Sequence, residues 1–326
     1  MNNNDVFRKT TSVDPRRHAS SLDLIRTDAQ TVMDLGLLPP RPDDELDLFF
    51  SPVFLFQTCL PIRPVSEKHL VNGAYVRRNG DLYMEMRSSV RPDFLPSGKF
   101  PRQFLMWLTN AITRYPESLN VEGEFRLDFS FRAFCRSMGI NSSTGEKGSG
   151  RAMIDQIIRL MGTTFVIQRR PRPGSKEPLK IRTFAISSNL ELAWDEERMK
   201  PKQWMDSIDA KIKLSRDFCA EIRDRAMPID SRHLSVICKG RSALRIDVYH
   251  FLVSRNYALV TSGRSGNLAS IPFAELHEQF GSNSTTAEFV RQFMGEIHWV
   301  KKNLGPGLLF SPTRDQRFLL AESPPP

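Results

Sequence analysis

The residues of this chain that could carry out chemistry do not form a catalytic arrangement. The glycine-rich segment 139–150 suggests a phosphate-binding loop, which requires the pattern G-x-x-x-x-G-K-[ST]. Here five residues separate Gly139 from Gly145, and Glu146 stands before Lys147, so the register does not fit. A polar turn explains the same glycines. We therefore expect no nucleotide hydrolysis from this segment.

The histidines argue against a metal-dependent nuclease. An enzyme that nicks DNA with a tyrosine can place it beside a metal held by two histidines that are one residue apart. None of the six histidines has such a partner; they are His18, His69, His233, His250, His277 and His298. Isolated imidazoles at the surface or in the core account for all of them.

The four cysteines do not suggest a metal or redox site either. They form no C-x-x-C pair, and reduced thiols buried in a core are the simplest explanation. They are Cys59, Cys135, Cys219 and Cys238. The sequence thus predicts a protein that is not an enzyme and has no metal and no cofactor.

Positive charge is concentrated between Glu146 and Arg182. Nine cations and three acids in this stretch give +6, against +9 for the whole chain. A solvated charged face is the alternative, but such a surface mixes both signs more evenly. We interpret the cluster as a contact surface for DNA phosphates and groove edges. Its candidate residues are Lys147, Ser149, Arg151, Gln156, Arg159, Arg169, Arg170, Arg172 and Lys176.

A second, weaker cluster lies near the C-terminus. Between Gly281 and Arg317, five cations and three acids give +2. Thr285 and Thr286 suit phosphate contacts at a helix N-terminus. Arg291 and Gln292 are expected on the side of that helix opposite Phe289 and Phe293, where they could reach guanine or adenine edges. Arg314 and Arg317 complete this candidate DNA-binding set.

Sequence patterns predict the elements that position the first cluster. Asn79-Gly80 marks a hairpin within 74–88, and a helix begins near Phe100 with Pro101 in its first turn. Apolar residues then predict a short helix over 131–138 and a third helix with Ile154, Ile157, Ile158 and Met161 inward. Strands over 163–168 and 181–186 flank the basic loop 169–176. This is the order of elements of a winged helix.

The second half repeats this order. A strand near 208–214 and helical turns over 215–239 come first. Two apolar helical faces follow, one around Leu244 and one from Phe273 to Phe280, the latter between Pro272 and Gly281. Thr285 to Glu288 has the pattern of a capping box and opens a third helix. Apolar pieces at 307–310 and 317–320 predict a second hairpin wing.

These elements predict a helix-rich α+β fold with two tandem winged-helix domains and small β-hairpin wings. The 326 residues, 40% hydrophobic, suffice for two cores. The expected divisions are a flexible arm over 1–55, domain 1 over 56–194, a linker over 195–206, domain 2 over 207–321 and a Pro-rich tail over 322–326. No apolar run approaches the length of a membrane span, and no signal peptide is evident, so we expect a soluble cytoplasmic protein.

Several motifs together resemble one family. In the first half they are Leu95 to Arg102, Leu108 to Ala111, Ser130 to Phe134, Met138 to Ile140, Ser143 to Gly145 and Gln156 to Leu160. In the second half they are Ser215 to Phe218, Glu221-Ile222, Pro228 to Asp230, Ser242 to Tyr249, Phe251-Leu252 with Arg255, Phe273 with Leu276, and Gln279 to Gly281. Over about residues 95–320 the chain resembles the plasmid-encoded RepA replication initiators.

The resemblance implies a function and partners. It implies a bacterial protein that binds direct repeats (iterons) in double-stranded DNA at a plasmid origin, remodels the duplex and recruits the host initiator and helicase. It also implies a dimer that represses its own gene. Arg151, Gln156, Arg159, Arg291 and Gln292 would then face the groove, and the wings would contact phosphate. Ser97 and Lys99 depart from the family pattern, which bears on the dimer interface.

Three alternatives remain open. A winged-helix transcriptional repressor would share all these features, because a fold does not decide function. The second alternative is an enzyme that acts on nucleic acid. The phosphate-binding loop and the histidine pair of such enzymes are missing from the sequence, and an assay for nicking or ATP hydrolysis would detect such an activity. An RNA-binding module should display aromatic side chains on a sheet face, and Tyr75, Tyr83 and Tyr257 are too scattered in the sequence to predict one.

Overall fold

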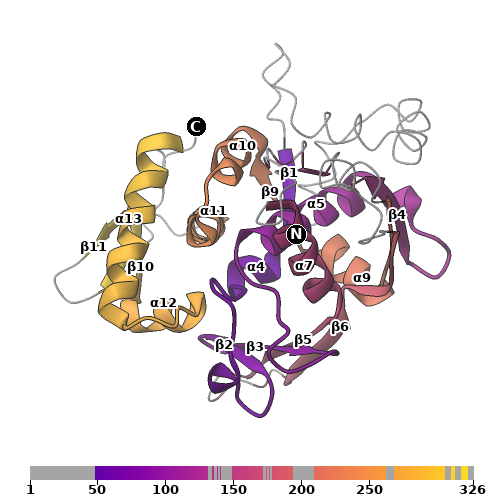
Figure 1. The fold of residues 1–326 in the computed structure, drawn as a ribbon. Helices are drawn as coiled ribbons and strands as arrows, with labels where there is room; N and C mark the ends of the chain where they lie inside the picture. The colour runs from indigo at the N-terminus through magenta and orange to yellow at the C-terminus, as the bar shows by residue number, and fades with distance from the viewer. Residues whose placement is uncertain are drawn as a thin grey trace.

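The computed structural model is a helix-rich mixed fold, with four small antiparallel sheets among the residues it describes (Figure 1). The predicted α+β class is therefore confirmed at this level. The structure describes residues 48–130, 134–135, 138, 140, 149–171, 174, 176, 178–193, 209–261, 268–304, 310–312 and 317–321. The predicted helix over 131–138 lies mostly outside this part of the chain, although residues 134 and 135 are helical.

The largest sheet has the strand order β2-β3-β5-β6. Its strands are β2 (Tyr75–Asn79), β3 (Leu82–Ser88), β5 (Thr163–Arg169) and β6 (Lys180–Ala185). The first two form the predicted hairpin, with Gly80 at a positive φ of 59° in the turn. In β3, Leu82, Met84 and Met86 are buried while the alternate residues are not. One face of the sheet therefore packs on the core and the other faces outward.

The inner face of this sheet packs against α4 (Val53–Gln57) and α9 (Arg216–Arg225). The Phe54 ring lies 5.6 Å from that of Phe165 and 5.7 Å from that of Phe184, and the Phe184 and Phe218 rings are 6.2 Å apart. The last part of the predicted arm is thus in the core. Strand β1 (Leu48–Pro52) and helix α4 form there because Phe49, Phe54 and Leu55 are apolar and bury almost completely.

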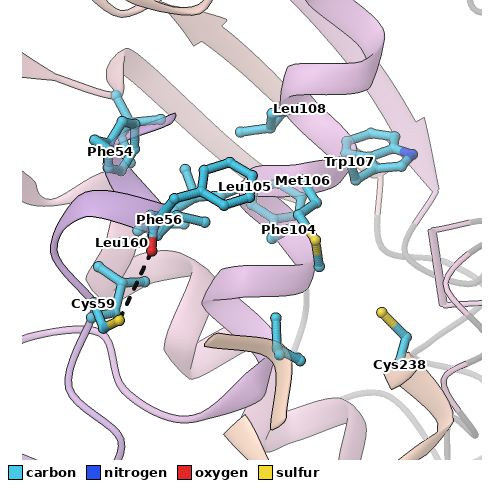
Figure 2. Close-up of a cluster of buried hydrophobic side chains, with 14 of the residues drawn as sticks. Phe54, Phe56, Cys59, Phe104, Leu105, Met106, Trp107, Leu108, Leu160 and Cys238 are labelled. Carbon is cyan, nitrogen blue, oxygen red and sulfur yellow. Dashed lines mark hydrogen bonds between the residues drawn. The ribbon is translucent and has the colours of Figure 1, made fainter. Parts of the chain in front are cut away.

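Helix α5 (Lys99–Arg114) occupies the centre of the molecule. It begins where predicted, but it is buried on every side from Pro101 to Ile112 and not on one face alone. The reason is that β1, α7 (Ser149–Met161), α9 and α11 (Ala243–Thr261) all contact it. Figure 2 shows Phe104 to Leu108 of this helix beside Phe54 and Phe56 of α4. The four cysteines are free and buried, as predicted.

A three-stranded sheet joins segments on either side of the predicted linker. Its order is β4-β8-β7, from β4 (Phe125–Ser130), β8 (Asp209–Leu214) and β7 (Ser187–Ala193). The predicted first strand of domain 2 therefore pairs with two strands of domain 1. Helix α9, which follows β8, also packs on α5 and β6. Elements before and after the predicted linker 195–206 thus contact each other. The linker residues themselves lie outside the described residues.

The second half contains the predicted helices and hairpin. They are α10 (Ser231–Lys239), α11, α12 (Phe273–Phe280), α13 (Thr286–Leu304), β11 (Phe310–Pro312) and β12 (Arg317–Ala321). Strand β10 (Leu268–Pro272) was not predicted, and it pairs with β12 in the sheet order β10-β12-β11. The buried rings of Phe251, Phe280, Phe289 and Phe293 form the core between α11, α12 and α13.

Several contacts join the two halves. Strand β9 (Ala226–Asp230), which lies where helical turns were predicted, pairs with β1. Arg102 of α5 and Asp247 of α11 form a fully buried ion pair with two hydrogen bonds of 2.6 Å. The Arg102 guanidinium also donates to the carbonyls of Leu60, Pro61 and Gly98. All the charge of this pair is therefore compensated within the protein.

Candidate nucleic-acid interface

The first basic cluster is carried by α7 and by the β5–β6 hairpin. Helix α7 buries Met153, Ile154, Ile157 and Leu160 against the core, so the opposite side faces outward. Arg151 is exposed there and Ser149 is half-exposed at the helix start. Lys147 lies outside the described residues. The periodicity of apolar residues thus predicted correctly which face of this helix is available.

Two residues predicted to face the groove are engaged within the protein. The Gln156 side-chain oxygen accepts a 2.6 Å hydrogen bond from the backbone N–H of Ser97. Arg159 pairs with Asp155 at 2.7 Å, and its guanidinium lies 4.2 Å from the centre of the Phe94 ring. Both side chains therefore hold the segment that leads into α5. Their role in reading bases stays a prediction.

The hairpin between β5 and β6 presents basic side chains. Arg169, Arg170 and Lys176 are exposed, and Arg172 lies outside the described residues. Gly174 adopts a positive φ of 81°, a conformation that suits a hairpin loop. The Arg170 guanidinium stacks on the Tyr83 ring with 4.3 Å to the ring centre. The hairpin can thus offer fixed positive charge to a phosphate backbone.

The second cluster is centred on the turn between α12 and α13. Gly281 ends α12 in the left-handed conformation at φ 65°. His277 spans the turn, because its Nε2 lies 3.0 Å from the Ser282 carbonyl oxygen and its Nδ1 lies 3.1 Å from the Thr286 Oγ1. The Thr285 hydroxyl accepts from the Glu288 N–H at 3.3 Å, which is one half of the predicted capping box.

Arg291 lies exposed on the outer side of α13, as predicted, whereas Gln292 is half-buried at the flank of the face that carries Phe289 and Phe293. Both donate to the Glu288 carboxylate, Arg291 at 2.6 and 2.9 Å and Gln292 at 2.5 Å. The Arg291 bonds, with those of Gln292, lower the pKa of Glu288 to about 2. Arg291 remains exposed, so DNA would have to compete with this carboxylate for it. Arg314 lies outside the described residues, and Arg317 starts β12.

Arg78 and Tyr83 were not predicted as site residues. They face each other across β2 and β3, with the Arg78 guanidinium 5.3 Å from the Tyr83 ring centre. The alternation of the Asn79-Gly80 hairpin places them on one face, and this signal was present in the sequence.

Within the described residues no group of three or more His, Cys, Asp or Glu could hold a metal. In the same part of the chain no helix is long and apolar enough to cross a membrane.

The fold and the basic surfaces define a helix-rich α+β protein that presents positive charge on a helix face and a hairpin. Comparison with family models then identifies it: residues 95–271 match the plasmid encoded RepA protein family. The chain belongs to this family. The match ends before α12 and α13, so the second basic cluster lies beyond it.

Solved structures show a distant likeness. Domains 2 and 3 of RctB align with a TM-score of 0.47 at 16% identity, covering 90% of this chain and 96% of that chain. A second structure of the same domains aligns with a TM-score of 0.47 at 15% identity, covering 77% and 91%. A comparison with curated protein sequences finds no match.

Proposed function

We propose that this protein is a plasmid replication initiator that binds direct repeats in double-stranded DNA at its origin. The observation that carries the proposal is the family match over the segment that holds α7 and the basic β5–β6 hairpin. In this proposal each half is a winged-helix domain, with α7 and α13 in successive major grooves and the hairpins on phosphates. The protein makes and breaks no covalent bond.

The order of elements in the second half supports this assignment. Helix α11, strand β10, helices α12 and α13 and the hairpin β11–β12 follow one another, and β10 pairs with β12. We assign this order to a helix-turn-helix followed by a hairpin wing. Recruitment of host replication proteins, duplex remodelling and repression of its own gene as a dimer belong to the same proposal. A bacterial cytoplasm is the compartment where such a protein acts.

A transcriptional repressor with winged-helix domains is the alternative function. The test is a replication assay in which the gene and its flanking DNA are joined to a selectable fragment without an origin. The proposal expects transformants with the intact gene and none with a frameshifted copy, and expects that the protein supplied from a second plasmid restores them. A repressor would give no transformants in any arrangement, which would overturn the proposal.

A further inference from the structure

The outward face of the β2-β3-β5-β6 sheet carries an ordered row of side chains. The register pairs Arg78 with Tyr83, Tyr83 with Gln168 and Gln168 with Ile181, so these four residues cross all four strands in one line. Arg78 is exposed, Ile181 is 55% exposed, and Tyr83 and Gln168 are half-buried. Neighbouring strands are about 4.8 Å apart, so the row spans roughly 14 Å.

Two guanidinium groups lie on the Tyr83 ring. Arg78 approaches it from β2 and Arg170 from the end of β5, with 5.3 Å and 4.3 Å to the ring centre. A hydrogen bond from its Nε to the Gly80 carbonyl oxygen also holds Arg78. The backbone N–H of Arg170 donates to the backbone carbonyl oxygen of Asp81. In the part of the chain that the structure describes, neither guanidinium pairs with a carboxylate. Each guanidinium can therefore add an anion contact to its stacking on Tyr83.

Apolar side chains continue this surface on the other side of the ring. Leu179, 52% exposed, comes two residues before Ile181, and Ile181 lies diagonally across from the half-buried Val166. An aromatic ring with stacked guanidinium planes and exposed aliphatic groups suits the faces of unpaired bases, while the cations suit phosphates. A duplex keeps its base faces stacked inside and would use only the cations. Four-stranded sheets with aromatic side chains on one face stack two or three bases in this way.

We propose that the outward face of this sheet is a binding site for single-stranded nucleic acid, with Arg78, Tyr83 and Arg170 at its centre. The proposal rests on the proposed function in one respect, since opening an origin duplex supplies the single strand. The face adjoins the β5–β6 hairpin, so a strand released beside a bound duplex can pass directly onto it. The RNA-binding alternative required aromatic side chains on a sheet face, and the register places Tyr83 on such a face.

The test measures fluorescence anisotropy of the full chain with a labelled 20-nucleotide single-stranded DNA, an RNA of equal sequence and a scrambled duplex. Arg78→Gln should weaken binding to the single strand by about fivefold or more, because it removes a guanidinium that stacks with the bases. It should weaken duplex binding much less, because a duplex uses only the charge of this side chain and loses one cation. Lys239→Gln on α10 removes one exposed charge away from the sheet and should change neither affinity.

A second pair of variants separates stacking from folding. Tyr83→Ala should weaken single-strand binding by roughly 5- to 100-fold, whereas Tyr83→Phe keeps the ring and should bind like the wild type. Thermal melting of each variant shows that it is folded. Tighter binding of the DNA or of the RNA oligonucleotide identifies which strand is the ligand, and both outcomes support the site.

Two results would overturn the proposal. One is single-strand affinity that is equal in the wild type, Arg78→Gln and Tyr83→Ala. The other is no single-strand binding by the wild type. If the wild type binds no single strand but still binds duplex DNA specifically, the single-strand site is disproved and the proposed initiator function is unaffected. If a second copy of the chain occupied the face instead, Ile181→Ser would change the oligomeric state and the oligonucleotide would not bind.

Discussion

At the scale of single residues, the buried Arg102–Asp247 pair is the interaction that sequence periodicity could not show. Burial disfavours the charge on Arg102, but the Asp247 carboxylate and its hydrogen bonds outweigh this and raise the pKa of Arg102. Arg102 lies on a helix for which the sequence predicted one buried face, and a charged residue off that face is expected to face solvent. It is buried because α11 and the Leu60-Pro61 segment both pack against it.

Removing one member of this pair should strongly destabilise the fold. Arg102→Met leaves the Asp247 charge buried without a partner, and we expect a loss of about 3–5 kcal/mol in the free energy of unfolding. Urea denaturation followed by circular dichroism measures it. The double variant Arg102→Met/Asp247→Leu removes both charges and should lose less than the single variant. A single-variant loss below about 1 kcal/mol would contradict the account.

His250 gives a second residue-scale prediction, on pH. The ring is fully buried 4.6 Å from the Phe56 ring, and neither nitrogen has a hydrogen-bond partner among the described residues. Burial, with the nearby Arg102 charge, lowers the pKa of His250 to about 3. In the unfolded chain this imidazole has a pKa near 6.5. It therefore binds a proton in the unfolded state at pH values where it stays neutral in the folded state.

The sign of the effect follows from this difference. Between about pH 6.5 and pH 3 the unfolded state binds more protons, so the stability of the fold decreases as the pH falls, by up to about 1.4 kcal/mol per unit. His250→Phe removes this group and should flatten that part of the stability profile. Urea melts of both proteins from pH 7.5 to 4.5 provide the comparison. Parallel profiles would show that His250 is not buried in its neutral form.

At the scale of elements, the sequence predicted those whose pattern is local. The 3.6-residue periodicity located α5, α7, α12 and α13, and Asn79-Gly80 located the β2–β3 hairpin. Strand β1 was missed because its partner β9 lies far away, with Leu48 opposite Asp230. Strand β4 likewise pairs with the distant β8. Such pairings are set by tertiary contacts, which no short window of sequence contains.

The candidate site was predicted unevenly for the same reason. The exposed positions of Arg151 and Arg291 follow from which face of each helix is apolar. Arg169 is exposed because it ends β5, although alternation places it with the buried Phe165 and Ile167. The engagement of Gln156 with Ser97, and of Arg159 with Phe94, depends on a loop that approaches α7 from elsewhere in the chain. The sequence therefore located the cationic surface but not which of its side chains are already bound within the protein.

The end of α12 provides an element-scale prediction. Gly281 has a left-handed backbone, and the Arg77 guanidinium occupies the space that a Cβ would need. Gly281→Ala should therefore cost about 1–2 kcal/mol from the backbone alone. Gly295→Ala is the matched control, because Gly295 lies inside α13 with open space at its Cβ position. It should be neutral or stabilise the fold by up to about 1 kcal/mol, and equal effects of both changes on the melting temperature would refute this account.

At the scale of the whole molecule, the two halves are joined through buried polar contacts as well as apolar ones. Gln103 donates to the Cys238 carbonyl at 3.0 Å, Gln279 donates to the Phe56 carbonyl at 3.0 Å, and Tyr75 donates to the Gly281 carbonyl at 3.3 Å. These bonds connect α5 with α10, α12 with α4, and the turn after α12 with the first sheet. The spacing between the two proposed DNA-binding halves is thereby fixed by the fold.

The uneven charge of the two clusters predicts an uneven salt dependence. Neutralising Arg151, Arg169 and Lys176 to Gln should reduce the slope of log affinity against log salt more than neutralising Arg291, Lys301 and Lys302. Each phosphate contact contributes about 0.9 to this slope. Anisotropy titrations with one duplex at several salt concentrations measure both variants. Equal losses of slope would refute the greater electrostatic contribution of the first half.

The central claim is specific binding to repeated sites. The most direct measurement is a gel-shift salt titration of the purified protein on the DNA that flanks its own gene, against a scrambled duplex of equal length. We expect a ladder of shifted bands that persists at salt concentrations that strip the scrambled duplex, because the protein occupies several equivalent repeats independently. One band alone would favour a repressor, and equal binding to both duplexes would contradict specific recognition.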